Sequence, residues 1–357
     1  MNKMIYKTVL AIASFVLLAS SCMKEIDLEH LRPDPKLVLN GLVLAGDTVR
    51  VHLTRTWFYT EDKPDLNIKN PDIKLFVNGV FKEQMTWVEY SEEGLYPSDW
   101  YSYDDNLDIR GYYTATYQPA EGERIRITAE AEGFASISAE TIVPVKPSLK
   151  DIAVHEKKTV TEEYYYTHPP RDIRVIFEDN PGKRDFYIIN FEYGFPLHGE
   201  GYGKVEYTGE YGWRAYSPDY SSDPLFTSHL SAIDKILGYD WISGEHGRAF
   251  SDDLIEGKEY TIKLRSDKYY YSYSSSDYIP DDQRPPDMYR VNLYSITEDY
   301  YRYIKAIIEM RDGGGVNEHM SDIGLAEPVR MFSNVEGGVG ILGAATRDSI
   351  TTTVIPQ

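Results

Sequence analysis

Cysteine is almost missing from this chain, since Cys22 is the only one among 357 residues. One thiol cannot form an intrachain disulfide, so we expect the folded core to be stabilised by burial of apolar side chains. The roughly 335 residues after Cys22 suffice for one large domain or two ordinary ones.

Long apolar runs and basic residues are also scarce. The apolar segment Val9–Leu18 is about half as long as the roughly 20 residues that a transmembrane helix needs. The chain has 37 Lys and Arg against 57 Asp and Glu, a formal net charge of −20, and removal of residues 1–21 with Lys3 and Lys7 leaves −22. Such an acidic chain repels phosphate backbones, and no basic stripe interrupts it, which excludes nucleic acid as a partner.

Catalytic and metal-binding motifs are missing as well. Neither H-E-x-x-H nor G-x-S-x-G occurs, and the glycine-flanked His246 is read as a loop histidine. Asp104, Asn106 and Asp108 hint at a calcium loop, but Ala115 stands at the twelfth position, where a bidentate Glu is required. We therefore predict no catalytic residues, no metal and no cofactor. Paired carboxylates of a hydrolase remain an open alternative, because their spacing is spatial.

What is present begins with a leader. Lys3 and Lys7 form a basic region before the apolar segment, and the small residues Ala19, Ser20 and Ser21 precede Cys22. This order predicts a bacterial lipoprotein signal peptide over residues 1–21, with Cys22 as the first mature residue and the lipid attachment site. An ordinary cleaved signal peptide is the alternative.

The residues after Cys22 predict a tether. Residues 22–35 are polar and contain two prolines, which is typical of an extended spacer. Two or more acyl chains hold a protein stably on a membrane. Glu25 and Asp27 resemble the export signal of Bacteroidota surface lipoproteins, so the expected location is the outer membrane, facing the cell exterior.

Strand patterns dominate the rest of the chain. Alternation of apolar and polar residues, as in residues 49–54, and the hairpin dipeptide Asn78-Gly79 recur through residues 36–147. The 31 tyrosines also favour strands. We predict an all-β fold, with an N-terminal immunoglobulin-like β-sandwich over residues 36–147 and a second, larger β-rich domain over residues 148–357 that carries one or two short helices.

One helix is predicted near residues 296–311. Ser295 and Glu298 have the spacing of a capping box, and apolar residues then recur at helical spacing until a glycine run that begins at Gly313. A shorter helix is expected over residues 228–237.

Several sequence blocks together carry a family resemblance. Besides the leader with Cys22, they are Ile26-Asp27, Leu37–Val43, Phe250–Asp253, Gly257–Tyr260, Tyr300–Tyr303 and Ser333–Gly343. On these residues the chain resembles the Bacteroidota outer-membrane lipoprotein family of domain of unknown function 4249. The resemblance implies a surface lipoprotein, often encoded beside a TonB-dependent transporter, and it supplies no catalytic residues.

The block Gly338–Gly343 also satisfies G-x-G-x-x-G. A dinucleotide site needs a following helix, a further strand and an acidic residue about 20 positions on, and the 14 residues after Gly343 leave no room for them. We interpret these glycines as part of a strand and tight turn packed closely against a neighbour.

Two aromatic clusters are the candidate ligand-binding residues. One contains Trp100, Tyr101 and Tyr103, and the other contains Tyr211 and Trp213. Aromatic side chains beside acidic ones suit a glycan or peptide ligand, or docking onto a transporter. The alternative is that they only cap the two β-domains.

These observations favour an accessory binding or docking component of a TonB-dependent nutrient uptake system, held on the outer membrane by its lipid. A surface hydrolase of glycan or peptide, with an acidic and aromatic-lined site, is the first alternative. A structural or adhesive envelope protein is the second. An enzyme is the less favoured class.

Overall fold

The computed structural model describes residues 32–58, 61, 65–90, 109–156, 167–168, 170–198, 207–227, 248–266, 269–270, 286, 288–311 and 331–355. The chain divides into two units. Met1–Pro35 and Trp57–Pro64 form the first, and Lys36–Thr56 and Asp65–Gln357 form the second.

Most of the described residues of the second unit lie in strands. The strands are β1 (Leu37–Leu44), β2 (Arg50–Arg55), β3 (Asp72–Val77), β4 (Val80–Gln84), β5 (Thr86–Glu89), β6 (Gly111–Thr114), β7 (Arg124–Glu130), β8 (Ile137–Ile142), β9 (Ser148–Glu156), β10 (Thr167–His168), β11 (Arg171–Glu178), β12 (Phe186–His198), β13 (Tyr207–Tyr216), β14 (Arg248–Ser251), β15 (Glu259–Ser266), β16 (Tyr269–Tyr270), β17 (Met288–Ile296), β18 (Val335–Glu336) and β19 (Val339–Ile355). The described helices are α2 (Pro224–Thr227) and α4 (Glu298–Arg311). The predicted all-β class is confirmed.

The first sandwich is built from two groups of strands. One follows the order β19-β1-β2-β6-β5, and the other is a five-stranded sheet in the order β18-β8-β7-β3-β4. Both contribute to one buried cluster, to which β1 gives Leu37, Leu39 and Val43. Alternate residues of β1 are buried, so its sequence period of two places the apolar side chains on one face.

The predicted hairpin at Asn78-Gly79 is confirmed. It joins β3 to β4, and both residues have positive φ, 51° and 82°, as a type I′ turn requires. The immunoglobulin-like topology of this sandwich stays a prediction, and the structure adds a parallel pair, β1 with β19.

The second sandwich has its own core. Strands β13, β12, β17 and β19 lie side by side in one sheet, with β14 also paired to β12, while β15, β11 and β9 form the facing layer. Side chains from both layers form a second buried cluster that includes Phe177, Tyr187, Phe191 and Val291. Aromatic residues fill much of this core, in agreement with the high tyrosine content.

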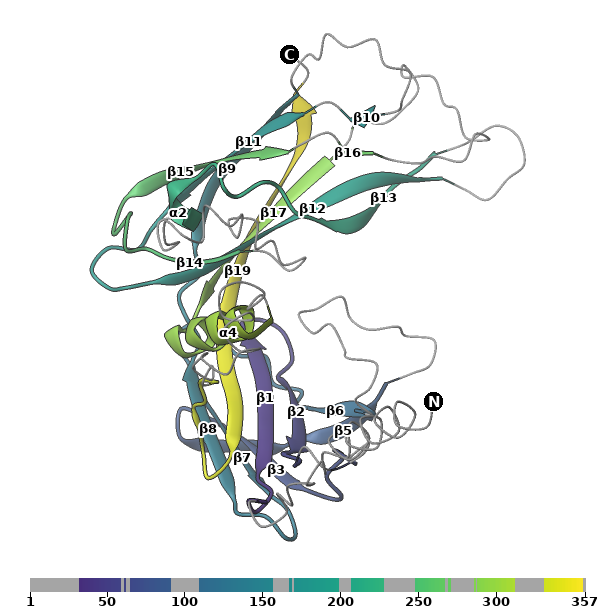
Figure 1. The fold of residues 1–357 in the computed structure, drawn as a ribbon, viewed down its shortest axis with the longest axis vertical. Helices are drawn as coiled ribbons and strands as arrows, with labels where there is room; N and C mark the ends of the chain where they lie inside the picture. Colours follow the sequence, from purple (N-terminus) through teal and green to yellow (C-terminus); the bar gives the residue numbers. More distant parts are fainter. Residues whose placement is uncertain are drawn as a thin grey trace, which may run out of the picture. The chain divides into compact units, whose positions relative to one another are not determined.

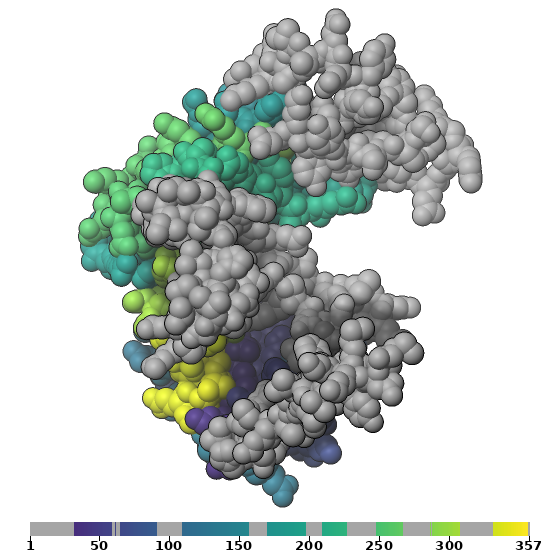
Figure 2. Space-filling model, viewed as in Figure 1, coloured from purple at the N-terminus to yellow at the C-terminus, as the bar shows by residue number. Residues whose placement is uncertain are grey.

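Strand β19 belongs to both sandwiches (Figure 1). Residues 339–345 pair in parallel with β1, residues 345–353 pair antiparallel with β17, and Val354 and Ile355 pair in parallel with β9. In the space-filling view the yellow C-terminal segment lies directly beside the purple N-terminal strand (Figure 2). The C-terminal residues thus complete a sandwich that otherwise uses residues 37–142.

Helix α4 confirms the helix predicted near residues 296–311. Its Tyr300, Tyr303 and Ile304 pack with Ile341 and Ala345 of β19 in a third apolar cluster. The predicted capping box is wrong. Ser295 is a buried residue of β17, paired with Thr346, and the helix begins at Glu298 with the Tyr301 N–H donating to the Thr297 carbonyl oxygen at 3.0 Å. Pairing with β19 extends the strand to Ile296 and overrides the local S-x-x-E signal.

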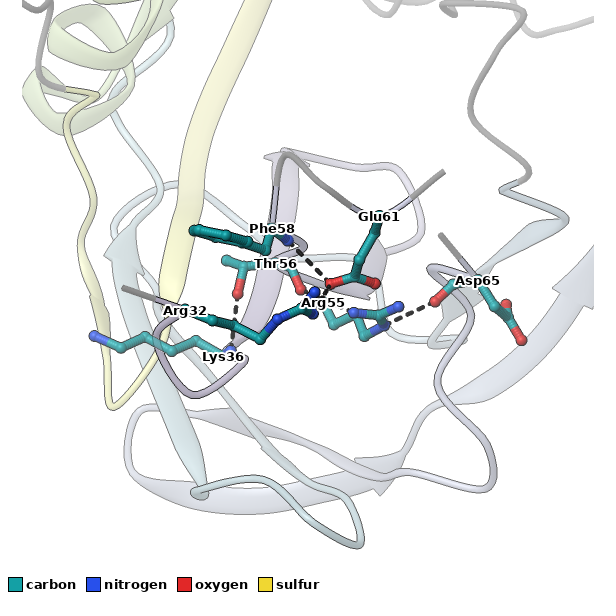
Figure 3. A network of polar contacts seen from close by, with 7 residues as sticks. All are labelled: Arg32, Lys36, Arg55, Thr56, Phe58, Glu61 and Asp65. Carbon is teal, nitrogen blue, oxygen red and sulfur yellow. Dashed lines mark hydrogen bonds and ion pairs between the residues drawn. The ribbon is translucent and has the colours of Figure 1, made fainter. Parts of the chain in front are cut away.

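Strand β2 ends at Arg55, shortly before Trp57–Pro64, which belong to the first unit. The Arg55 Nε donates to the Asp65 carbonyl oxygen at 2.8 Å, and the Lys36 N–H donates to Thr56 Oγ1 at 2.9 Å (Figure 3). These bonds fix the chain just before and just after residues 57–64, and they fix the start of β1.

Candidate functional site

Most of the predicted site residues lie outside the described part of the chain. This holds for Cys22, for the cluster of Trp100, Tyr101 and Tyr103, for the Asp104–Asp108 loop and for His246. The helix expected over residues 228–237 lies outside it too. Tyr211 and Trp213 are described, and both point to the same side of β13 because they are two residues apart.

The glycines of Ser333–Gly343 have a packing role. Gly340 has φ of +116°, and a Cβ there would lie 2.1 Å from the Leu39 carbonyl oxygen. A Cβ on Gly338 would lie 2.6 Å from the Leu37 carbonyl oxygen. These glycines let β19 run directly against β1, which confirms the interpretation as a closely packed strand and turn.

Residues of Phe250–Asp253 and Gly257–Tyr260 hold the start of β12. We call the group of Asp179, Arg184, Asp185, Asp252, Asp253 and Gly257 the clasp. The Asp185 N–H donates to Asp252 Oδ2 at 2.8 Å, and Arg184 binds Asp253 through two nitrogens at 2.9 and 2.7 Å. Asp179 accepts the Gly257 N–H and the Tyr187 hydroxyl, both at 2.6 Å. The buried carboxylates of Asp179 and Asp252 therefore fix loops by accepting hydrogen bonds from backbone N–H groups and from the Tyr187 hydroxyl.

The clasp also changes the acidity of its members. Burial, together with the nearby charges of Asp179 and Asp185, raises the pKa of Asp252 above its ordinary value, although the Asp185 N–H opposes this rise. The hydrogen bond from Arg184, aided by Ser251, lowers the pKa of the neighbouring Asp253. Two adjacent aspartates thus have opposite shifts.

The hairpin of β12 and β13 carries a reciprocal pair of aromatic residues and glycines. Gly194 is paired with Trp213, and Phe195 is paired with Gly212. A Cβ on Gly194 would lie 3.0 Å from the Trp213 ring, and one on Gly212 would lie 2.5 Å from the Phe195 ring. Each ring therefore covers the glycine directly opposite, and the two rings lie on opposite faces of the hairpin.

An arginine lies over each of these rings. The Arg290 Cζ is 3.7 Å from the centroid of the Trp213 ring, and the Arg214 Cζ is 4.8 Å from that of Phe195. Arg290 also forms an ion pair with Glu192 at 3.2 Å, with about one third of each side chain exposed. The place over Trp213 where a sugar ring could stack is thus taken by a guanidinium group.

A polar ladder continues from Arg290 across the sheet. The Asn292 Nδ2 donates to Glu192 Oε2 at 3.1 Å and to Asn190 Oδ1 at 2.9 Å, and the Ser349 hydroxyl donates to Asn292 Oδ1 at 2.5 Å. Tyr211 lies beside Trp213 with ring centroids 6.5 Å apart, and its hydroxyl donates to the Pro286 carbonyl oxygen at 3.0 Å. We call this surface the Arg290 face; its residues are Asn190, Glu192, Tyr211, Trp213, Arg290, Asn292 and Ser349.

The Arg290 face is the candidate site. Its side chains lie on the side of β12 and β17 opposite to Phe191, Tyr289 and Val291, which are buried in the second core. Trp, Tyr and Arg are the side chains most often found at the centres of protein interfaces. The fixed guanidinium, carboxylate and amides offer planar donors and acceptors, so the surface suits binding of a polar partner or ligand.

Sequence reasoning found Tyr211 and Trp213 but missed the rest of this face. Arg290 and Asn292 lie 77 and 79 residues after Trp213 and come near it only through strand pairing, with Glu192 on the strand between them. The one local signal was their position in strands of alternating polarity. Asp179, Asp252 and the buried Arg171, which donates to the Tyr289 hydroxyl, were missed for the same reason.

Other kinds of site find less support. Within the described ranges, no group of three or more His, Cys, Asp or Glu side chains could hold a metal ion. A shallow hollow of about 630 Å³, lined by turn residues 118–121 together with Lys146 and Arg347, lies beside the start of the second sandwich. Over the same residues, no helix has the length and apolar character to cross a membrane.

Comparison with known families gives one result. The family model described as Domain of unknown function (DUF4249) matches residues 24–351. No curated protein matches the chain. The matched region takes in both sandwiches, the clasp and the Arg290 face.

Proposed function

Because the chain belongs to the DUF4249 family, we propose that it is a lipid-anchored outer-membrane protein facing the cell exterior, and that it is an accessory docking component of a TonB-dependent uptake system. Cys22 is the proposed lipid attachment site, and a TonB-dependent transporter is the proposed partner. The predicted lipoprotein leader and the resemblance to Bacteroidota surface lipoproteins support the proposed location.

The Arg290 face is the observation that carries the docking role. It combines three residue types that dominate interface energetics, and the ladder of Glu192, Asn292 and Asn190 holds Arg290 in one position before any partner arrives. A preordered guanidinium loses little side-chain freedom on binding. A glycan or peptide cargo that bonds to the polar groups of the same face, without stacking on Trp213, is compatible with this role.

Among the residues that the structure describes, the hydrolase alternative finds no such support. Asp179, Asp185 and Asp252 are buried acids, and each accepts hydrogen bonds from nearby backbone or side-chain groups, so their positions are explained by loop structure. Glu192 is tied to Arg290 and Asn292. The structural or adhesive alternative differs from the proposal only in lacking a transporter partner.

Affinity purification tests the docking role. The tagged, acylated full-length protein is extracted from outer membranes in mild detergent, and a barrel transporter is expected to copurify with it. Arg290→Ala should weaken capture by about 30-fold, because truncation of a hot-spot residue costs about 2 kcal/mol or more.

Arg214→Ala is the matched control, since Arg214 lies over Phe195 on the opposite face of the same hairpin. It should leave capture unchanged. Preparations that lack any barrel protein, or equal capture by the two variants, would contradict the proposal.

A further inference from the structure

The first unit holds its own N-terminal segment through Arg32. The Arg32 guanidinium forms an ion pair with Glu61 at 3.1 Å, and its Cζ lies 5.2 Å from the centroid of the Phe58 ring (Figure 3). One side chain thus attaches the end of the predicted tether to the segment Trp57–Pro64. We call Arg32, Trp57, Phe58 and Glu61 the tether clip.

The clip is closed by a turn. The Glu61 N–H donates to the Phe58 carbonyl oxygen at 2.9 Å, and the Phe58 N–H donates to Glu61 Oε1 at 3.0 Å. The same carboxylate therefore orders the turn and binds Arg32. Trp57, directly before this turn, has 48% of its surface exposed.

The chain length limits how far the clip can lie from Cys22. Arg32 is ten residues after Cys22, and an extended chain spans at most about 3.6 Å per residue, so the distance is at most roughly 36 Å. Arg32 is bound to the turn, so the clip holds this end of the predicted tether. A bilayer that holds acyl chains on Cys22 is therefore at most roughly 36 Å from Arg32.

We propose that Trp57 enters the headgroup layer of the membrane that holds Cys22, and that the tether clip presents it there. The inference rests on the proposed lipid attachment. Tryptophan favours this layer because its ring is apolar while its N–H can bond to headgroups or water. The Arg32 guanidinium can stay in the same headgroup layer while its alkyl stem lies along apolar groups.

The observations favour a lipid surface over a protein as the occupant. Trp57 lies in the unit that also contains Cys22, whereas Trp87, similarly exposed at 43%, belongs to the other unit. The short tether raises the local concentration of bilayer around the clip, so even one tryptophan can stay inserted.

The test uses the single thiol of the mature chain. Protein beginning at Cys22 is coupled through that thiol to a maleimide-headgroup lipid in vesicles of phosphatidylcholine and phosphatidylglycerol, with part of the phosphatidylcholine brominated near the headgroup end of its acyl chains. Tryptophan fluorescence should be quenched, the Trp57→Phe variant should lose the Trp57 share of this quenching, and the Trp87→Phe control should retain it.

Equal quenching of the Trp57→Phe variant and the unchanged protein would overturn the inference, as would no quenching of the unchanged protein. Both substitutions are at exposed positions, so folding should be preserved. Chemical coupling supplies the anchor, so this result does not depend on native acylation. The mass of the native protein at Cys22 tests the attachment separately.

Discussion

Gly343 of β19 lies directly against the ring of Tyr300 in α4. A Cβ at this glycine would come within 2.5 Å of Tyr300 Cδ2 and 2.8 Å of its Cβ. Tyr300 has 4% of its surface exposed and packs in the cluster that joins α4 to the strands. The contact fixes how closely the helix approaches the shared strand.

Gly343→Ala should therefore destabilise the fold. Overpacking of a filled core costs about 1–3 kcal/mol, and equilibrium unfolding in urea measures the loss. In a Tyr300→Ala background the same substitution should cost less, because the ring that it meets is gone. Equal losses in both backgrounds would show that the clash is not with Tyr300.

The free energy of unfolding of the Asp252→Asn variant should rise relative to that of the unchanged chain as the pH rises from 4 to 7. The pKa of Asp252 is raised in the folded state, so its contribution to stability is present below the ordinary value of 3.8 and is lost as the pH rises through the folded pKa. Asparagine keeps an acceptor for the Asp185 N–H without the charge. A pH-independent difference in urea midpoint would contradict this expectation.

Asp253→Asn should have the opposite pH dependence. The pKa of Asp253 is lowered by Arg184 and Ser251, so its stabilising contribution is present above 3.8 and is lost as the pH falls through the folded pKa. The variant should be slightly less stable than the unchanged chain at pH 7 and equal to it in strong acid. High salt should shrink the difference, because the ion pair is exposed.

Tyr289→Phe should cost about 1–3 kcal/mol in urea unfolding, since it removes a hydroxyl that accepts a hydrogen bond from the buried Arg171. Tyr220→Phe is the control. Both tyrosines are 3% exposed, but the Tyr220 hydroxyl has no hydrogen-bond partner among the described residues, so its removal should be neutral or stabilising. Equal effects would contradict the assignment of the Arg171 bond.

Asn334→Ala should weaken the attachment of the segment before β18 to strand β19 and helix α4. The Asn334 side chain donates to the Leu342 carbonyl oxygen and accepts the Leu342 N–H, both at 3.0 Å, and it also donates to Asp299 of α4 at 3.1 Å. Its loss leaves partly buried groups unpaired, at about 1–3 kcal/mol. Faster amide hydrogen exchange at Leu342 would report the change directly.

Local features of the sequence were predictable because their causes are local. The hairpin at Asn78-Gly79 needs two residues that tolerate positive φ, and helix α4 needs only an apolar stripe over its own length. The all-β class follows from many such segments. Ser295 shows the limit, since its strand pairing with Thr346 outweighs a helix-start pattern.

The candidate site was predictable only in part. Tyr211 and Trp213 stand out as an aromatic pair in the sequence, but Arg290 comes to lie over Trp213 through two successive strand pairings. No local pattern encodes which strands become neighbours. The parallel pair of β1 with β19, about 300 residues apart, is the strongest example.

Strand β19 pairs with strands of both sandwiches, and this affects the order in which the protein can fold during synthesis. Val339 and the residues after it are made last, yet they pair with Val38 and the residues after it, which are made first. Neither sandwich has all of its strands until nearly the whole chain has been synthesised. The early strands must therefore wait for β19, and a premature stop before residue 339 would leave both sandwiches without this strand.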